Sequence, residues 1–145
     1  MYFTPMAKQI YLNLPVKDLN KSIEFFSKLG FSFNPKFTDA NATCMNVGEN
    51  IYVMLLVEKF FQTFTKKEIA NAHKTVESII GITTESKNDV DKMLKKALSI
   101  GAKPANKPYD HGWMYGASFE DLDGHIWEIF FMDESKMPEE MKTKK

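Results

Sequence analysis

The sequence predicts an α+β protein made of two βαβββ modules, whose curled mixed sheet surrounds a cleft. Some segments have the alternating apolar residues of a strand, and others have the three- to four-residue apolar spacing of a helix. They occur in the order strand, helix, three strands, and this order occurs twice along the 145 residues. The two predicted helices also align position by position, Leu19 with Val90 and Leu29 with Ile100, each pair 71 positions apart. A repeat of this length indicates a duplicated structural unit.

Module one is predicted to span residues 8–58. Its helix begins after Asp18, a suitable N-cap residue, and ends at Gly30, a typical C-cap residue. A turn at residues 48–50 predicts a hairpin between its last two strands. The predicted elements are strand 9–14, helix 19–29, strand 31–37 interrupted by Pro35, strand 41–47 and strand 51–57.

Module two is predicted to span residues 75–133, after a linker at residues 59–74 and before a charged tail at residues 134–145. Ser86 and Asp89 have the spacing of a capping box, which predicts the start of the second helix. The linker contains Phe60, Phe61 and Phe64, which are expected to cover a ligand, line a dimer interface or pack locally. The predicted elements are strand 75–85, helix 86–100, strand 102–107, strand 112–120 and strand 125–132.

The charge and cysteine content limit the partners and the compartment. Nineteen basic residues balance nineteen acidic ones, so no basic excess indicates a nucleic acid or an anionic membrane as partner. No segment has the roughly 18 apolar residues that span a bilayer, and the first residues do not resemble a signal peptide. Cys44 is the single cysteine, which excludes an internal disulfide and favours a reducing, cytoplasmic location.

Two stretches, LPVKDLNKSIEFFSKLGF near the N-terminus and SFEDLDGHIWEIFFMD near the C-terminus, carry a resemblance to a known family. Together they resemble the vicinal oxygen chelate superfamily, which includes glyoxalase I, bleomycin-resistance proteins and extradiol dioxygenases. The resemblance extends over residues 8–133 and implies the glyoxalase/bleomycin resistance/dioxygenase fold. It also implies a homodimer. It does not specify the reaction, because one scaffold serves lyases, epimerases, dioxygenases and drug-sequestering proteins.

The resemblance also implies four positions for metal ligands, one on the first and one on the last strand of each module. In this sequence they fall on Tyr11, Met54, a residue near Ile80, and Glu128. Glu128 alone matches the His, Gln or Glu that metal-dependent relatives use. One carboxylate does not provide the three or more ligands of a divalent metal site, so no metal cofactor is expected. The alternative is a divalent metal held through Glu128 with ligands elsewhere.

Three functions remain open from the sequence. In the first, the cleft binds a small organic molecule without a metal, and Glu128 binds a donor or a cation on that ligand. In the second, the protein is a metal-dependent enzyme of the lactoylglutathione lyase type in which Glu128 is catalytic. In the third, the cleft is filled and the protein is structural or regulatory. The ligand-binding candidates are Tyr11, Tyr52, Met54, His111, Trp113, Tyr115 and Glu128.

Overall fold

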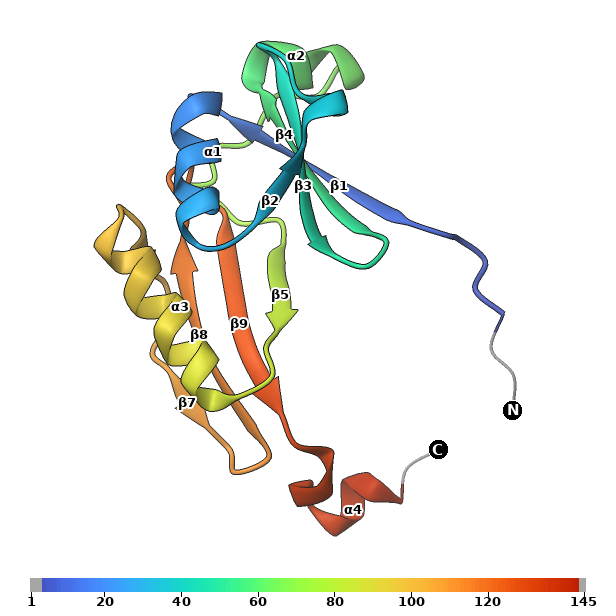
Figure 1. Ribbon diagram of the computed structural model, residues 1–145, viewed down its shortest axis with the longest axis vertical. Helices are drawn as coiled ribbons and strands as arrows, with labels where there is room; N and C mark the ends of the chain where they lie inside the picture. Colours follow the sequence, from blue (N-terminus) through green and yellow to red (C-terminus); the bar gives the residue numbers. More distant parts are fainter. Residues whose placement is uncertain (1–3, 144–145) are drawn as a thin grey trace. The chain divides into compact units, whose positions relative to one another are not determined.

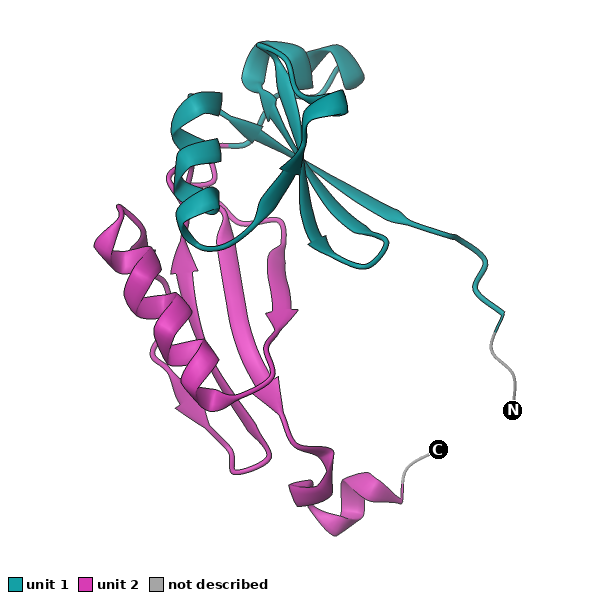
Figure 2. Ribbon diagram, viewed as in Figure 1, with its two compact units in different colours: residues 1–70 teal, residues 71–145 magenta. Residues whose placement is uncertain are grey.

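The computed structural model describes residues 4–143, and the chain divides into two compact units. Unit 1 is Met1–Ala70 and unit 2 is Asn71–Lys145, coloured teal and magenta in Figure 2. The division lies inside the linker predicted at residues 59–74. Each unit contains one mixed sheet with a helix on one face, which confirms the α+β class and the two modules, and the strands form two sheets, one in each unit. The cleft expected between the modules stays a prediction.

Unit 1 contains a four-stranded sheet in the order β1-β4-β3-β2 (Figure 1). The first strand pairs in parallel with the last, because the helix carries the chain back across the sheet before the remaining strands are added. The other two strand pairs are antiparallel. The elements of the sheet and its helix are β1 (Ile10–Val16), α1 (Leu19–Lys28), β2 (Ser32–Asn34), β3 (Ala42–Gly48) and β4 (Ile51–Val57).

Local sequence signals set the ends of α1 and of the β3–β4 hairpin. The side chain of Asp18 accepts a hydrogen bond from the Lys21 backbone N–H at 3.0 Å, as expected of an N-cap. Gly30 follows the helix with φ +107°, a conformation in which glycine has no steric penalty. Asn50 occupies the left-handed region in the hairpin turn, with φ 62°. These ends agree with the sequence-based prediction.

Unit 2 repeats the arrangement with the strand order β5-β9-β8-β6, and one additional short strand pairs with β8. The first strand again pairs in parallel with the last. The helix lies along β8 and β9 in Figure 1. The elements are β5 (Ile79–Thr83), α3 (Lys87–Ser99), β6 (Lys103–Pro104), β7 (Tyr109–Asp110), β8 (Met114–Glu120) and β9 (Ile126–Met132).

The registers of the two units confirm the duplication. In unit 1 Cys44 is the partner of Met54, and in unit 2 Ser118 is the partner of Glu128, each 74 positions later. The helices also correspond, since Gly101 has φ +115° at the position equivalent to Gly30. α3 begins three residues before the position that corresponds to the start of α1, and Ser86 caps it by accepting from the Asp89 N–H at 3.1 Å.

Each sheet has a helix face, which packs against the helix of its unit, and a far face on the other side. Alternation along the strands places large apolar groups on the helix face. In unit 1 the buried residues there include Leu14, Val16, Met45, Val53 and Leu55. In unit 2 they are Ala117, Phe119, Trp127 and Ile129. The candidate residue Glu128 therefore lies on the far face, because its strand neighbours point to the helix.

Several predicted elements differ in extent from the structure. The strand predicted over residues 75–85 is limited to β5, and β7 was not predicted. The linker contains two short helical segments, α2 (Glu58–Phe61) and η2 (Gln62–Phe64), in which Phe60 and Phe64 make an edge contact at 5.2 Å. The remaining short segments are η1 (Pro35–Phe37), η3 (Glu134–Lys136) and α4 (Glu139–Lys142). Among the residues described, none of the helices has the length and apolar content needed to span a bilayer.

Candidate functional site

Glu128 lies in the middle of β9, half-buried on the far face of unit 2. Its partners across the sheet are Gly81 on β5 and Ser118 on β8. The Ser118 hydroxyl oxygen accepts a hydrogen bond from the Asn106 backbone N–H at 2.9 Å. The carboxylate therefore has a glycine and a serine as its neighbours on the two adjacent strands.

Tyr109 on β7 lies beside this row and was not among the residues selected from the sequence. It is the backbone partner of Gly116, whose other partner is Phe130 on β9. The Tyr109 ring packs so closely on Gly116 that a Cβ at position 116 would collide with the phenol oxygen. Burial, followed by the nearby Glu128 carboxylate, raises the pKa of Tyr109. Tyr109 is therefore a neutral phenol directed toward the acidic side chain.

A second aromatic ring lies against a glycine on the same face. A Cβ built on Gly81 would lie 3.1 Å from Cε1 of Phe130, so this ring leans over the backbone of β5. Phe130 and Tyr109 thus each cover a glycine: Phe130 covers Gly81 in the row of Glu128, and Tyr109 covers Gly116 in the adjacent row. Two aromatic rings therefore lie in the row next to that of the carboxylate.

The other candidates of unit 2 divide between the two faces. His111 is exposed and stacks on the ring of Tyr109, with 5.1 Å between ring centroids. Trp113 is half-buried in the turn before β8, where its carbonyl oxygen accepts from the Asp133 N–H at 2.7 Å. Tyr115 lies on the helix face, since it pairs with Phe131 and its hydroxyl contacts Asp91 of α3 at 2.5 Å. The structure does not bring Tyr115 together with Glu128.

The candidates of unit 1 lie together on the far face of its own sheet. Tyr11 and Tyr52 are register partners, and their rings stack with 4.8 Å between centroids. Tyr11 is 44% exposed, and its hydroxyl donates to the Gln9 side chain at 3.4 Å. Met54 is half-buried on the same face and pairs with Asn13 and Cys44. This face offers aromatic and thioether surface. Met54 occupies the position at which unit 2 has the Glu128 carboxylate.

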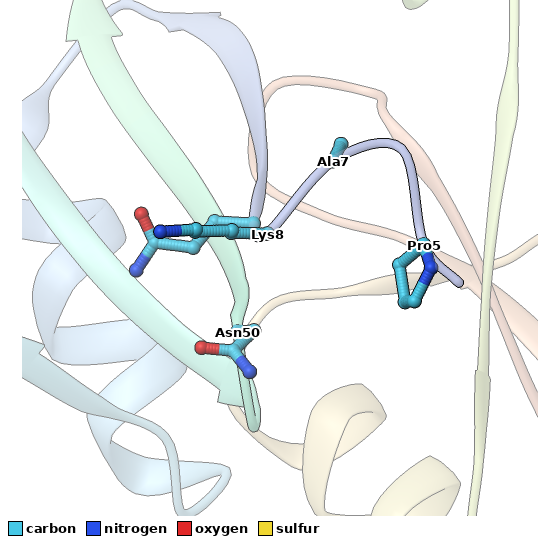
Figure 3. Close-up of a pocket in the computed structure, with 5 residues that line it drawn as sticks. Pro5, Ala7, Lys8 and Asn50 are labelled. Atoms are coloured by element: carbon cyan, nitrogen blue, oxygen red, sulfur yellow. The ribbon is translucent and has the colours of Figure 1, made fainter.

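A separate hollow of about 550 Å³ lies at the start of β1 in unit 1 (Figure 3). Its chemistry is that of one ammonium group, two amides and small apolar surface. None of the ligand-binding candidates lines it. The lining residues are Pro5, Ala7, Lys8, Gln9 and Asn50.

The residues at the four ligand positions do not form a donor set for a divalent metal. Near the predicted position, Ile80 pairs with Trp127 on the helix face, whereas its neighbours Ile79 and Gly81 lie on the far face with Glu128. Isoleucine offers no donor at either position, and Met54 is a poor ligand for a hard cation. Within residues 4–143, no group of three His, Cys, Asp or Glu side chains is placed so that it could hold a metal ion.

A buried carboxylate supports the turn that leads into β9. Asp121 is 5% exposed and accepts hydrogen bonds from the backbone N–H of Asp123 at 2.9 Å and of His125 at 3.0 Å. Its second oxygen accepts from Nε1 of Trp127 at 2.9 Å. Burial raises the pKa of Asp121. These bonds fix the start of β9 and thereby the position of Glu128 on the strand.

Residues 8–129 match the model of the Glyoxalase/Bleomycin resistance protein/Dioxygenase superfamily. Among curated proteins no match was found. A solved structure of the hypothetical protein SA1046 from S. aureus is 28% identical, covers 88% of this chain and 95% of that one, and gives a TM-score of 0.75.

Two further solved structures are similar at lower identity. A glyoxalase/bleomycin resistance protein/dioxygenase family enzyme from Burkholderia phytofirmans PsJN is 16% identical, with 85% of this chain and 97% of that chain covered and a TM-score of 0.72. TioX from Micromonospora sp. ML1 is 18% identical, with 88% of this chain and 100% of that chain covered and a TM-score of 0.64. At such identities the similarity shows the fold.

Proposed function

Because this chain belongs to the glyoxalase/bleomycin resistance protein/dioxygenase superfamily, we propose that it binds a small organic molecule on the far face of unit 2 through Glu128, without a metal. The supporting observation is a half-buried carboxylate at a position where metal-dependent relatives hold an ion, while the corresponding positions carry Tyr11, Met54 and Ile79. Such a carboxylate is suited to accept hydrogen bonds from a ligand or to bind its cationic group.

The aromatic residues support an aromatic or cationic ligand. Phe130 and Tyr109 border the row that contains Glu128, and aromatic faces attract both flat rings and cations. The stacked pair of Tyr11 and Tyr52 gives unit 1 a similar exposed surface. Its contribution to binding is a separate proposal, which Tyr52→Ala tests independently of Glu128.

Proflavine, a flat aromatic cation, is the probe for this function. The proposal predicts saturable quenching of tryptophan fluorescence by proflavine, weakened about tenfold or more by Glu128→Gln because the charge of the acceptor is lost. Glu134→Gln is the matched control, since Glu134 is exposed in η3 and carries the same charge. Equal affinity of Glu128→Gln and wild type would contradict the role of Glu128. Trp113→Phe identifies which tryptophan reports.

Metal analysis separates this function from the alternative metal-dependent lyase. The proposal predicts substoichiometric metal in the purified protein and a melting temperature unchanged by a chelator. Stoichiometric zinc, nickel, iron or manganese, with a melting temperature that falls on chelation, would favour the lyase instead. The homodimer that the resemblance implies stays a prediction, and light scattering of the purified protein tests it.

A further inference from the structure

The hydroxyl of Tyr109 is buried, and no protein atom forms a hydrogen bond of standard geometry with it. Of the buried side-chain nitrogen and oxygen atoms in the described part of the chain, it is the one that makes no hydrogen bond. Buried hydroxyls are normally paired, and leaving one unpaired is unfavourable. The neighbouring Glu128 carboxylate acts on the phenol without closing a hydrogen bond of standard geometry. The oxygen thus lies near the Glu128 carboxylate, and its hydrogen-bonding capacity is not fully used by the protein.

Gly116 is the feature that allows this position. A Cβ there would meet the oxygen and two ring carbons of Tyr109, so the phenol can lie against the sheet only because residue 116 has no side chain. The equivalent residue in unit 1, 74 positions earlier, is Ala42, which pairs with Leu56 as Gly116 pairs with Phe130. The glycine is therefore found in unit 2, where Tyr109 packs against it, and the equivalent residue of unit 1 is an alanine.

We propose that Tyr109 and Glu128 together bind a carboxamide group of the ligand, with the Tyr109 hydroxyl donating to the amide oxygen and the Glu128 carboxylate accepting from the amide N–H. This inference rests on the proposed function and specifies the chemical class that the Glu128 site takes. It also adds Tyr109 to the binding residues.

The chemistry of the two side chains selects an amide over other small groups. A phenol with a raised pKa remains protonated at neutral pH, so it offers a donor, whereas the carboxylate offers an acceptor. A ligand carboxylate would place a second negative charge beside Glu128. A quaternary ammonium would satisfy the charge of Glu128 but leave the Tyr109 hydroxyl unpaired. An amide presents a donor and an acceptor close together and satisfies both.

Three benzyl or phenyl compounds of similar size test the inference: benzamide, benzyltrimethylammonium and benzoate. Binding is followed by the amide resonances of Gly116, Ser118 and Glu128 in NMR spectra of the whole protein. Benzamide is expected to shift these resonances, and Tyr109→Phe, which retains the ring, is expected to weaken benzamide about three- to tenfold, the range of one hydrogen bond. Benzoate is expected not to bind. Tyr115→Phe is the control, because it removes a hydroxyl from the helix face of the same sheet.

Each outcome decides between the two proposals. Equal affinity of benzamide for wild type and Tyr109→Phe overturns the amide inference, and so does the absence of benzamide shifts at these residues. Binding of benzyltrimethylammonium that depends on Glu128 and not on the Tyr109 hydroxyl overturns the inference but leaves the proposed function standing. If Glu128→Gln changes the binding of neither benzamide nor proflavine, both fail. Should Tyr109→Phe unfold the protein, Gly116→Ala, which displaces the phenol, replaces it with the same expected loss.

Discussion

The two units share one strand order and one register but differ on the far faces of their sheets. On the helix face, equivalent positions are buried and apolar in both, as Val53 and Trp127 or Leu55 and Ile129 show. On the far face, Met54 of unit 1 corresponds to Glu128 of unit 2, 74 positions later. One face of the duplicated unit has thus kept a common character while the other has diverged.

This difference separates the residues that form the fold from those that give a surface its chemistry. The helix face must exclude water, so apolar groups of several sizes serve there as long as their volumes fit together. The far face makes different demands in the two units, because β7 adds Tyr109 beside β8 in unit 2. Ala42 and Gly116 show this difference at equivalent positions, since a methyl group is present in unit 1 and would collide with Tyr109 in unit 2.

The largest effect is expected from the helix face of unit 2. Trp127→Ala removes a side chain that is 0% exposed and also leaves Asp121 without one donor, so it should destabilise the protein by about 3–5 kcal/mol. Val53→Ala at the equivalent position should cost about 2 kcal/mol, because it removes two buried methyl groups. Urea unfolding followed by circular dichroism measures both. A loss from Trp127→Ala no larger than that from Val53→Ala would contradict this ranking.

Asp121 makes the turn of unit 2 sensitive to pH. Its folded pKa is raised by burial, so its contribution to stability is fully present below the unfolded pKa of about 3.9 and is lost as pH rises through the folded pKa. Asp121→Asn cannot titrate, and its amide opposes the Trp127 N–H, which should cost about 1–3 kcal/mol.

The expected result is that wild type loses stability relative to Asp121→Asn as the pH rises from about 4, the unfolded value for aspartate. Urea unfolding of both proteins at a series of pH values measures this difference. A difference that stays constant across the series would contradict a raised pKa in the folded state.

Gly116→Ala gives the far face of unit 2 the residue that unit 1 has at the equivalent position, Ala42. The added methyl group meets the Tyr109 phenol, so the ring must move and the protein should lose about 1–3 kcal/mol. The reverse exchange, Ala42→Gly, should cost about 0.5–1 kcal/mol through backbone entropy. Thermal unfolding measures both variants. If Gly116→Ala is neutral and the Tyr109 resonances do not change, the close packing of Tyr109 on residue 116 is wrong.

Small effects are also expected from exchanging Cys44 and Ser118, which are equivalent partners of Met54 and Glu128. Ser118→Cys weakens the acceptor for the Asn106 N–H, and Cys44→Ser buries a hydroxyl in a residue that is 1% exposed. Each should cost about 1 kcal/mol, the net value of one hydrogen bond. Chemical unfolding of the two single variants tests this. A stabilising Cys44→Ser would show that a partner for the hydroxyl exists beside residue 44.

The sequence predicted the parts of the fold that depend on local signals. Asp18, Ser86, Gly30 and Gly101 mark helix ends that the structure confirms, because capping and positive φ act within a few residues. The strand at residues 51–57 was predicted with the bounds of β4. β5 was predicted too long, since the alternation over residues 75–78 is not matched by a pairing strand there.

The candidate site was predicted in part. Glu128 was selected because a carboxylate in an apolar strand needs a partner or a function, and the structure places it on the far face. Tyr109 was missed because a two-residue strand has no detectable period. Tyr115 was grouped with Glu128, although it faces α3, because alternation within one strand does not tell how its phase matches that of the neighbouring strand.

By itself, the sequence determined the duplicated βαβββ order, the helix ends and the acidic group in the last strand, since period, caps and residue type are local properties. The tertiary structure decided which side chains share a face. Register between strands, and the closeness of Tyr109 to Gly116, arise from hydrogen bonds and packing between segments distant in sequence. A pattern along one strand carries no information about that alignment, because shifting it by one residue reverses every side chain.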